Sequence, residues 1–301
     1  MLHATENAGF RPTGEFAQLN SYENRVFDIK LEESDIPRVI AKFYRPGRWS
    51  REAILEEHAF LADLQKEGIS AVAPLSQKGQ GTLSTISGMN VAFFPKVLGR
   101  MPDEFIGDDL QQIGRLLARI HNVGAQRKFK HRPTLGSTPW TAWEALELLS
   151  HWVSPEVWPR YESAAVQIIE NLEDKLNFNN FLRIHGDCHR GNLLYNQKFF
   201  FVDFDDSMMG PEVQDFWMLF QNSSLEEKDL ILKGYEELRD FPQSQWKLVP
   251  ALRGLRIISY SSWIARRWED PSFPRLFPHF RDYTFWAEET EALERIAWTQ
   301  E

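Results

Sequence analysis

The feature that most constrains this chain is the segment 183–206, which reads Arg-Ile-His-Gly-Asp-Cys-His-Arg-Gly-Asn-Leu-Leu-Tyr-Asn-Gln-Lys-Phe-Phe-Phe-Val-Asp-Phe-Asp-Asp. A polar loop at 185–192 runs into a first apolar stretch at 193–195, and a second apolar stretch follows at 199–202. Polar residues at 196–198 separate the two stretches. Short apolar runs on either side of a polar turn predict a β-hairpin. The hairpin determines where the polar side chains at its two ends lie.

Three of those polar side chains form a pattern with a chemical meaning. A turn centred between Gln197 and Lys198 places Asn192 opposite Asp203, with Asp187 upstream on the loop. Magnesium prefers oxygen ligands such as these and is usually shared with substrate phosphates. Asp187 would orient an attacking hydroxyl and accept its proton. The spacing therefore predicts a kinase-type active site; the alternative is a polar hairpin that carries acids by chance.

The composition favours a soluble cytoplasmic protein. The 301 residues suffice for two domains or one two-lobed unit, and 43% of them are hydrophobic. A net charge of −9 argues against a nucleic-acid-binding protein, and the one cysteine rules out an internal disulfide. The N-terminus lacks the basic and apolar regions of a signal peptide, and no run approaches the roughly 18 apolar residues of a membrane span. We expect a cytoplasmic monomer that binds neither nucleic acid nor membranes.

The first part of the chain has the pattern of a small β-rich lobe with one helix. β-Branched and aromatic residues between turn-prone ones predict strands at 15–20, 24–30, 37–44, 81–86 and 91–94. The turn between the first two strands, Asn20-Ser21-Tyr22-Glu23-Asn24, lacks the glycines of a phosphate-binding loop. Its backbone amides and the Ser21 hydroxyl would still suit a cover over phosphates, but an ordinary hairpin turn fits the pattern equally well.

A lysine inside the third strand suggests a second part of the site. Lys42 lies in Val-Ile-Ala-Lys-Phe-Tyr, where a lysine either extends its charge to solvent or contacts nucleotide phosphates. The helix that begins after the N-cap Ser50 has Glu57 on the same stripe as its apolar residues. Because a carboxylate on an apolar stripe needs a partner, we expect Glu57 to pair with Lys42 and steady it on the nucleotide. Glu56, in a more polar setting on the helix, is the second choice.

The rest of the chain is mainly helical in pattern, with apolar residues at helical spacing in 110–120, 140–149 and 156–176. We therefore expect an α+β fold of two lobes. The smaller, β-rich lobe would span 1–96 and clamp the nucleotide. The larger, mainly helical lobe would span 97–301 and carry the catalytic and substrate sites.

Several segments are typical of one family. They are Asn20-Ser21-Tyr22-Glu23-Asn24-Arg25-Val26, Lys42-Phe43-Tyr44-Arg45-Pro46, Ile54-Leu55-Glu56-Glu57-His58, His131-Arg132-Pro133-Thr134, His185-Gly186-Asp187-Cys188-His189, Val202-Asp203, Arg266-Arg267-Trp268 and Asp270-Pro271. In these segments the chain resembles the bacterial stress response kinase A family (the YihE or RdoA type), within the aminoglycoside-phosphotransferase and choline-kinase-like kinases. The likeness to the wider class rests on 185–203, and that to the narrower family on the Ser-Tyr-Glu-Asn and Arg-Arg-Trp segments.

The resemblance implies a bilobal protein-kinase-like fold and ATP-dependent phosphorylation of serine or threonine on proteins during envelope or oxidative stress. It implies that Asp187 is the catalytic base, that Asn192 and Asp203 bind magnesium, and that Ser21 contacts ATP. Compared with that family, the chain begins close to its first strand and ends early. We therefore expect the leading helix to be short or absent.

Some roles stay open at this point. His189 would either contact the transferring phosphate or brace the loop, and Asp205 would either reach a second metal ion or stabilise a turn. A small-molecule kinase of the aminoglycoside, choline or homoserine type would share nearly every catalytic residue. A non-catalytic ATP-binding scaffold is a further alternative, against which the intact catalytic residues argue.

Overall fold

The computed structural model describes residues 1–32, 35–136, 142–221 and 223–298. Its contacts divide the chain into two compact units. The first unit comprises Met1–Arg132, Leu182–Met208 and Met218–Phe241, and the second comprises Pro133–Phe181, Met209–Trp217 and the chain from Pro242 onward. The first unit thus contains both the predicted N-terminal lobe and the predicted hairpin. The lobe boundary between residues 96 and 97 stays a prediction.

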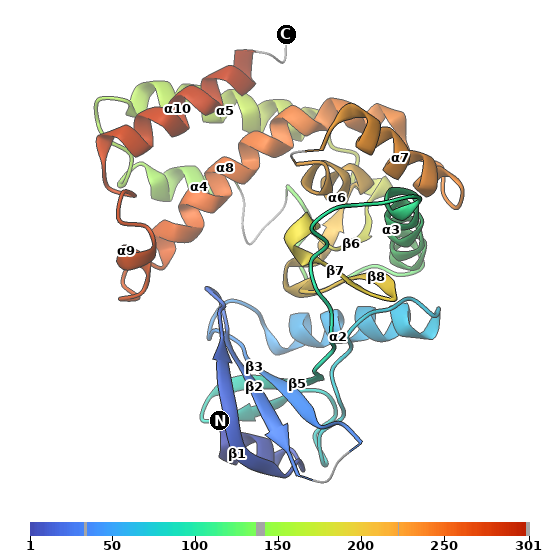
Figure 1. Cartoon of the computed structure of the whole chain (residues 1–301). Coiled ribbons are helices and arrows are strands. Elements are labelled where there is room, and N and C mark those ends of the chain that lie inside the picture. The colour runs from blue at the N-terminus through green and yellow to red at the C-terminus, as the bar shows by residue number, and fades with distance from the viewer. Residues whose placement is uncertain (33–34, 137–141, 222, 299–301) are drawn as a thin grey trace. The chain divides into compact units, whose positions relative to one another are not determined.

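The first unit holds a five-stranded sheet, the hairpin and several helices (Figure 1). Its elements in chain order are α1 (Leu2–Asn7), β1 (Pro12–Leu19), β2 (Arg25–Leu31), β3 (Arg38–Phe43), α2 (Arg51–Lys66), β4 (Ser84–Ile86), β5 (Met89–Pro95), α3 (Asp109–Ala125), β6 (Leu182–Ile184), β7 (Leu193–Asn196), β8 (Lys198–Phe201) and α7 (Leu225–Glu236). Two further elements, β9 (Met208–Gly210) and α6 (Glu212–Leu219), contain residues of both units.

The predicted strands of the N-terminal region form one antiparallel sheet in the order β1-β2-β3-β5-β4. Along β3 the side chains alternate between buried and partly buried, because the two faces of the sheet have different surroundings. Val39, Ala41 and Phe43 lie in one apolar cluster with Ala4 of α1. The short helix α1 therefore covers this face of the sheet.

The other face of the sheet carries Lys42. In the sheet register Lys42 pairs with Ala92 of β5, and directly paired residues lie on the same face. Ala92 packs with Ile54 of α2, so this helix covers the face on which Lys42 lies. The helix begins at the predicted N-cap, because the Ser50 side chain accepts a hydrogen bond from the Ala53 N–H (3.1 Å).

The predicted hairpin forms, but its register differs from the prediction by one residue. β7 and β8 pair antiparallel about a turn centred on Gln197. Gln197 has a φ of 59°, and this left-handed conformation lets the chain reverse about a single residue. The Val202 N–H donates to the Asn192 carbonyl (2.9 Å). Asn192 therefore lies opposite Val202, and the expected placement opposite Asp203 is wrong.

The second unit is mainly helical in the ranges that the structure describes, apart from its residues of β9. Its helices are α4 (Ala142–Leu149), α5 (Trp158–Lys175), α8 (Val249–Arg266), α9 (Phe273–Leu276) and α10 (Tyr283–Trp298). α5 packs against α8 and α10, and α4 packs against α8 (Figure 1). The first two residues of the predicted helix 140–149 lie outside the described residues. No helix in the described parts of the chain is long and apolar enough to cross a membrane.

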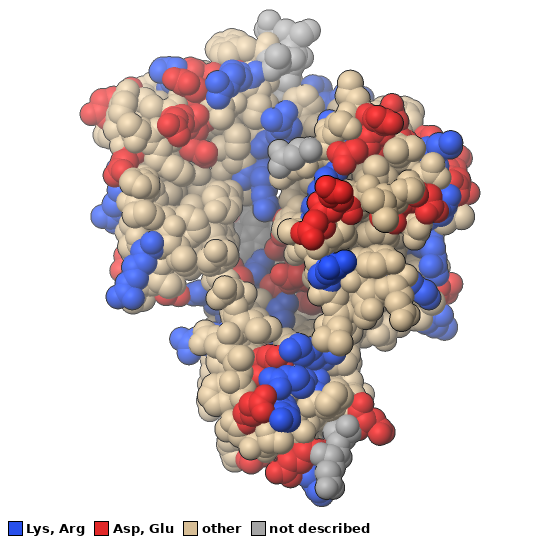
Figure 2. Space-filling view, in the orientation of Figure 1, with Lys and Arg blue, Asp and Glu red and all other residues tan. Residues whose placement is uncertain are grey.

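Acidic and basic side chains are intermixed over the N-terminal sheet on the face that Figure 2 shows. Within this sheet, Arg38 of β3 pairs with Asp28 of β2 at 2.7 Å and with Glu15 of β1 at 2.7 Å. Lys96, directly after β5, also pairs with Asp28 at 2.6 Å. The pair of Arg38 with Asp28 links two neighbouring strands, and the other two pairs each reach across one intervening strand. None of the three involves the predicted site residues.

Candidate active site

The loop that leads into β7 is held by the ring of His185. The Asp187 N–H donates to His185 Nδ1 (3.3 Å), and His185 Nε2 donates to the Val202 carbonyl (2.9 Å). Together these bonds fix the tautomer in which Nε2 carries the proton. The buried ring therefore ties the loop that carries Asp187 to the residue that precedes Asp203.

Asn192 is oriented by the same loop. Its side-chain Nδ2 donates to the Asp187 carbonyl (3.0 Å), and its backbone N–H donates to the His189 carbonyl (2.9 Å). Because the amide nitrogen is used in this way, the amide oxygen is available as a ligand. The structure thus connects the predicted base and the first predicted metal ligand within one short loop.

Asp203 follows β8 in a conformation that few residues adopt. Its φ of 62° and ψ of 63° are left-handed, and such a conformation costs a non-glycine residue about 1–3 kcal/mol. The side chain is 59% exposed, and its Oδ1 lies 3.6 Å from the Nζ of Lys42. The backbone at Asp203 therefore turns away from the strand and presents the carboxylate beside the lysine of β3.

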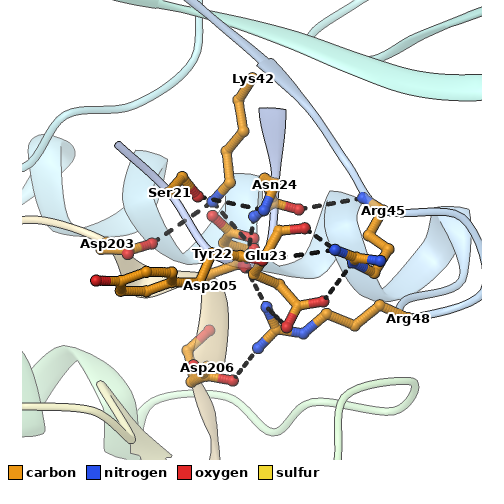
Figure 3. A network of polar contacts seen from close by, with 12 residues as sticks. Ser21, Tyr22, Glu23, Asn24, Lys42, Arg45, Arg48, Asp203, Asp205 and Asp206 are labelled. Atoms are coloured by element: carbon orange, nitrogen blue, oxygen red, sulfur yellow. Dashed lines mark hydrogen bonds and ion pairs between the residues drawn. The ribbon is translucent and has the colours of Figure 1, made fainter. Parts of the chain in front are cut away.

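Lys42 extends from β3 to two carboxylates (Figure 3). Its Nζ lies 3.0 Å from Asp205 Oδ1 and 3.6 Å from Asp203 Oδ1, and its side chain is 11% exposed. Burial alone would lower the pKa of the Lys42 ammonium, but the charges of Asp205 and Glu57 hold this pKa well above its ordinary value. Lys42 is therefore a charged group next to the second predicted metal ligand.

The expected ion pair between Glu57 and Lys42 is not among the contacts of the described chain. Glu57 is buried on the inward stripe of α2, as predicted, but its Oε2 lies 3.5 Å from Nη1 of Arg132. Asp205 occupies the place beside Lys42 that was expected for Glu57. Burial raises the pKa of Glu57 to about 7, against the opposing charges of Lys42 and Arg132. Helical periodicity gave the correct face for Glu57 but the wrong partner.

Glu56, the second choice as a partner of Lys42, has a different role. Its carboxylate accepts hydrogen bonds from three consecutive backbone N–H groups, those of Lys130 (2.7 Å), His131 (2.9 Å) and Arg132 (3.0 Å). Glu56 therefore holds the loop that carries Arg132, and the expectation that it could replace Glu57 beside Lys42 is also wrong.

The turn at 20–24 is ordered by its own side chains and by Arg45. The Ser21 hydroxyl accepts a hydrogen bond from the Asn24 N–H (3.2 Å), and the Asn24 side-chain oxygen accepts one from the Arg45 N–H (3.1 Å). Arg45 Nε in turn donates to the Glu23 carbonyl (3.1 Å). Ser21 thus stabilises the turn, and its contact with ATP stays a prediction.

His189 lies next to the predicted base. Its Nε2 is 3.5 Å from Asp187 Oδ2, which is the contact expected of a residue that braces the loop. A contact between His189 and a nucleotide phosphate stays a prediction. Cys188, between these two residues, is buried.

Three residues at the site were not identified from the sequence: Asn24, Arg48 and Arg132. Arg132 is buried, and its guanidinium donates to three main-chain carbonyl groups, those of Ala53, Asp205 and Ser207. Its one sequence signal was its place in a family-like segment. Arg48 follows Pro-Gly in a turn-prone stretch, and such stretches usually lie on the surface. No local pattern therefore indicated that Arg48 would contact buried carboxylates.

The fold and the site together define a kinase-like phosphotransferase. Residues 15–246 match the phosphotransferase enzyme family. The chain is 35% identical to stress response kinase A of Escherichia coli (strain K12), over 96% of this chain and 89% of that protein. It is 36% identical to the serine/threonine protein kinase RdoA of Salmonella typhimurium (strain LT2), over 90% of this chain and 84% of that protein. The chain therefore belongs to the phosphotransferase enzyme family and, within it, to the stress response kinase A family, as the resemblance predicted.

Solved structures with the same fold include two kinases of small molecules. Amicoumacin kinase hAmiN, in complex with AMP-PNP, Ca²⁺ and Ami, has a TM-score of 0.76 at 19% identity, over 98% of this chain and 93% of that one. A microcompartment-associated aminopropanol kinase has a TM-score of 0.73 at 19% identity, over 99% of this chain and 97% of that one. At these identities the likeness concerns the fold, and the predicted kinase-like fold is confirmed.

Proposed function

We propose that this protein is a serine/threonine protein kinase that transfers the γ-phosphoryl group of ATP to a hydroxyl group of a protein during a stress response. The observation that carries the proposal is the likeness to RdoA, a relative named as a serine/threonine protein kinase and matched over 90% of this chain. Membership of the phosphotransferase enzyme family supports the class of reaction.

Asp187 is the proposed base. Its carboxylate would accept the proton of the acceptor hydroxyl while the hydroxyl oxygen bonds to the γ-phosphorus and the bond from that phosphorus to the bridging oxygen breaks, which releases ADP. The contact with His189 and the bond from Asn192 to the Asp187 carbonyl would hold the base in place. The ammonium of Lys42 would contact the phosphates.

Asn192 and Asp203 are the proposed ligands of Mg²⁺. Both side chains provide oxygen atoms, which this cation prefers. The hydrogen bond to the Asp187 carbonyl uses the amide nitrogen of Asn192, so the amide oxygen is available as a ligand. The Asp203 side chain is 59% exposed. Bound Mg²⁺ would offset the charge of the phosphate oxygens. Two protein ligands, with phosphate oxygens and water as the others, are the usual arrangement for Mg²⁺ in kinases.

A small-molecule kinase is the second candidate. The fold likeness to the amicoumacin and aminopropanol kinases favours it. Both candidates would use the same catalytic residues, so only the acceptor distinguishes them. An ATP-binding scaffold, in contrast, would bind the nucleotide without transferring phosphate to either kind of acceptor.

The proposal is tested by transfer of labelled phosphate from Mg·ATP to protein acceptors and to small amino alcohols in parallel. Wild-type protein is compared with Asp187→Ala. Asp282→Ala is the control, because Asp282 is an exposed aspartate of the second unit that pairs with His279. We expect protein labelling by the wild type and the control. Asp187→Ala should lower kcat by about 10²- to 10⁴-fold while ATP binding is retained. Chelation of the divalent cation should also abolish transfer.

Each other result has a defined meaning. Labelling of amino alcohols without labelling of proteins would replace the protein-kinase proposal with the second candidate. ATP binding without transfer to any acceptor would favour the scaffold. Transfer that persists in Asp187→Ala would overturn the assignment of the base.

A further inference from the structure

The carboxylate partner of Lys42 is Asp205, and the contacts of Asp205 extend to the turn at 20–24 (Figure 3). We propose that Asp205 and Arg48 are positioning residues for nucleotide binding. They hold Lys42 and this turn in a fixed position beside Asp203. The inference depends on the proposed function in one respect only, that the protein binds ATP.

Asp205 uses both carboxylate oxygens. Its Oδ1 lies 3.0 Å from the Nζ of Lys42, and its Oδ2 accepts hydrogen bonds from Asn24 Nδ2 (2.9 Å) and Arg48 Nη1 (2.8 Å). Its side chain is 5% exposed. One carboxylate therefore connects β3, the turn at 20–24 and the segment after Asp203.

Arg48 connects the same parts of the molecule from another side (Figure 3). Its guanidinium contacts Asp205, lies 2.5 Å from Asp206 Oδ1 and lies 3.5 Å from Glu23 Oε2. Glu23 belongs to the turn at 20–24, and Asp206 lies three residues beyond Asp203. One planar guanidinium thus bridges three carboxylates, which would repel one another without it.

A lysine that contacts nucleotide phosphates needs a carboxylate partner to hold its ammonium group in place. In many kinases that partner is a glutamate of the helix that follows the strand. Here the corresponding Glu57 lies beside Arg132, with its Oε2 3.5 Å from Nη1 of that residue. Asp205 is in contact with Lys42, so the anchor of the lysine comes from the segment that carries the proposed metal ligand Asp203.

This arrangement has a consequence for nucleotide binding. Loss of the Asp205 charge frees the Lys42 ammonium from one side, and loss of Arg48 leaves Glu23, Asp205 and Asp206 in mutual repulsion. Either change should disturb the groups that face the phosphates of ATP. The adenosine part of the nucleotide should be affected much less, because neither Lys42 nor the turn recognises a base through these contacts.

The test compares the binding of ATP, with Mg²⁺ present, and of adenosine, which has no phosphates. Arg48→Gln and Asp205→Asn are the site variants. Arg38→Gln is the matched control, because Arg38 also bridges two carboxylates in the same unit, Asp28 and Glu15, at 2.7 Å each. We expect the Kd for ATP to rise about tenfold or more in both site variants, as the loss of a charge-assisted contact implies, while the Kd for adenosine changes by less than about twofold. Arg38→Gln should lower the Tm without changing either Kd.

The inference is overturned if the site variants weaken ATP and adenosine equally, or if they lower the Tm as Arg38→Gln does and leave the Kd for ATP unchanged. If Arg48→Gln does not fold, Arg48→Lys replaces it. This variant keeps the positive charge but loses the planar guanidinium that contacts several carboxylates, so the Kd for ATP should rise less. If wild-type protein binds ATP but labels no protein, the proposed function is rejected. The Kd values of the variants for ATP and adenosine then still decide whether this inference holds. Wild-type protein that does not bind ATP would reject the inference itself.

Discussion

The Oε2 of Glu57 lies 3.5 Å from the guanidinium of Arg132, and this contact places a buried carboxylate next to a buried arginine. The Arg132 guanidinium is at the same time bonded to main-chain carbonyl groups, so its charge is shared among several acceptors. Glu57 is left with incomplete compensation for its burial. Its protonation is therefore sensitive to pH in the neutral range.

The first prediction concerns the pH dependence of stability. Burial raises the pKa of Glu57 from its ordinary 4.5 to about 7, so between these pH values the folded state binds more protons at this position than the unfolded state. The contribution of Glu57 to the free energy of unfolding is fully present below pH 4.5 and is lost as the pH rises through about 7. Glu57→Gln removes this ionisation. The Tm of the variant minus that of the wild type should therefore increase over this interval and then level off.

Thermal unfolding of both proteins across that pH range measures the difference. Glu67→Gln at the end of α2 is the control, because Glu67 is exposed, and its Tm difference should stay flat. A Tm difference for Glu57→Gln that is independent of pH would show that Glu57 ionises in the folded protein as it does in the unfolded chain.

The second prediction concerns Glu56, which holds the loop at 130–132. Glu56→Ala removes one acceptor from three backbone N–H groups at once. We expect a loss of about 1.5–3 kcal/mol in the free energy of unfolding, as for other hydrogen bonds to a charged group. The amides of Lys130 and His131 should exchange faster with solvent, which hydrogen-exchange mass spectrometry or NMR detects. Equal exchange rates in Glu56→Ala and in Glu67→Ala would contradict this role.

The sequence predicted what local patterns determine. The strands of the N-terminal sheet follow from alternating and β-branched residues, and α2 begins where Ser50 provides an N-cap. The two strands of the hairpin were also found from their apolar runs. The register was missed by one residue because it depends on the left-handed backbone of Gln197, and glutamine at a turn carries no sign of that conformation.

The contacts between distant segments could not be predicted in the same way. Periodicity showed that Glu57 faces inward, but it does not measure the distance to Lys42 or reveal an arginine far along the chain. Asp205 lies two residues after a predicted metal ligand, and the sequence does not show which of the neighbouring carboxylates is buried. Burial and partner choice are tertiary properties, and they decide which charged groups act together.

The third prediction concerns His189. Because its ring lies 3.5 Å from the Asp187 carboxylate, His189→Ala should loosen the proposed base and lower kcat by roughly 10- to 100-fold, a loss in the range caused by small misplacements. The KM for ATP should change little if the ring braces the loop. Steady-state kinetics with varied ATP separates the two quantities, and His189→Asn, which keeps a polar group, should recover part of kcat. A rise in KM for ATP with an unchanged kcat would instead favour contact with a phosphate.

The last prediction concerns Gly186, directly before the proposed base. Gly186 has a φ of 85°, and a Cβ added there would lie 2.2 Å from the carbonyl oxygen of Asp206. Gly186→Ala therefore adds a collision between the new methyl group and the backbone of Asp206. This comes on top of the left-handed strain of about 1–2 kcal/mol. The loop must move to relieve the collision, and Asp187 moves with it.

Gly88→Ala is the matched control, since Gly88 has a similar φ of 79° but nothing within 4 Å of an added Cβ. We expect Gly88→Ala to lower the Tm modestly and to leave kcat unchanged. Gly186→Ala should lower the Tm further and reduce kcat by about 100-fold or more, because the base is displaced from the acceptor. Thermal unfolding and phosphate-transfer kinetics on the two variants test this directly. Equal losses of Tm with full activity in both would mean that the close approach of Gly186 to Asp206 does not position the base.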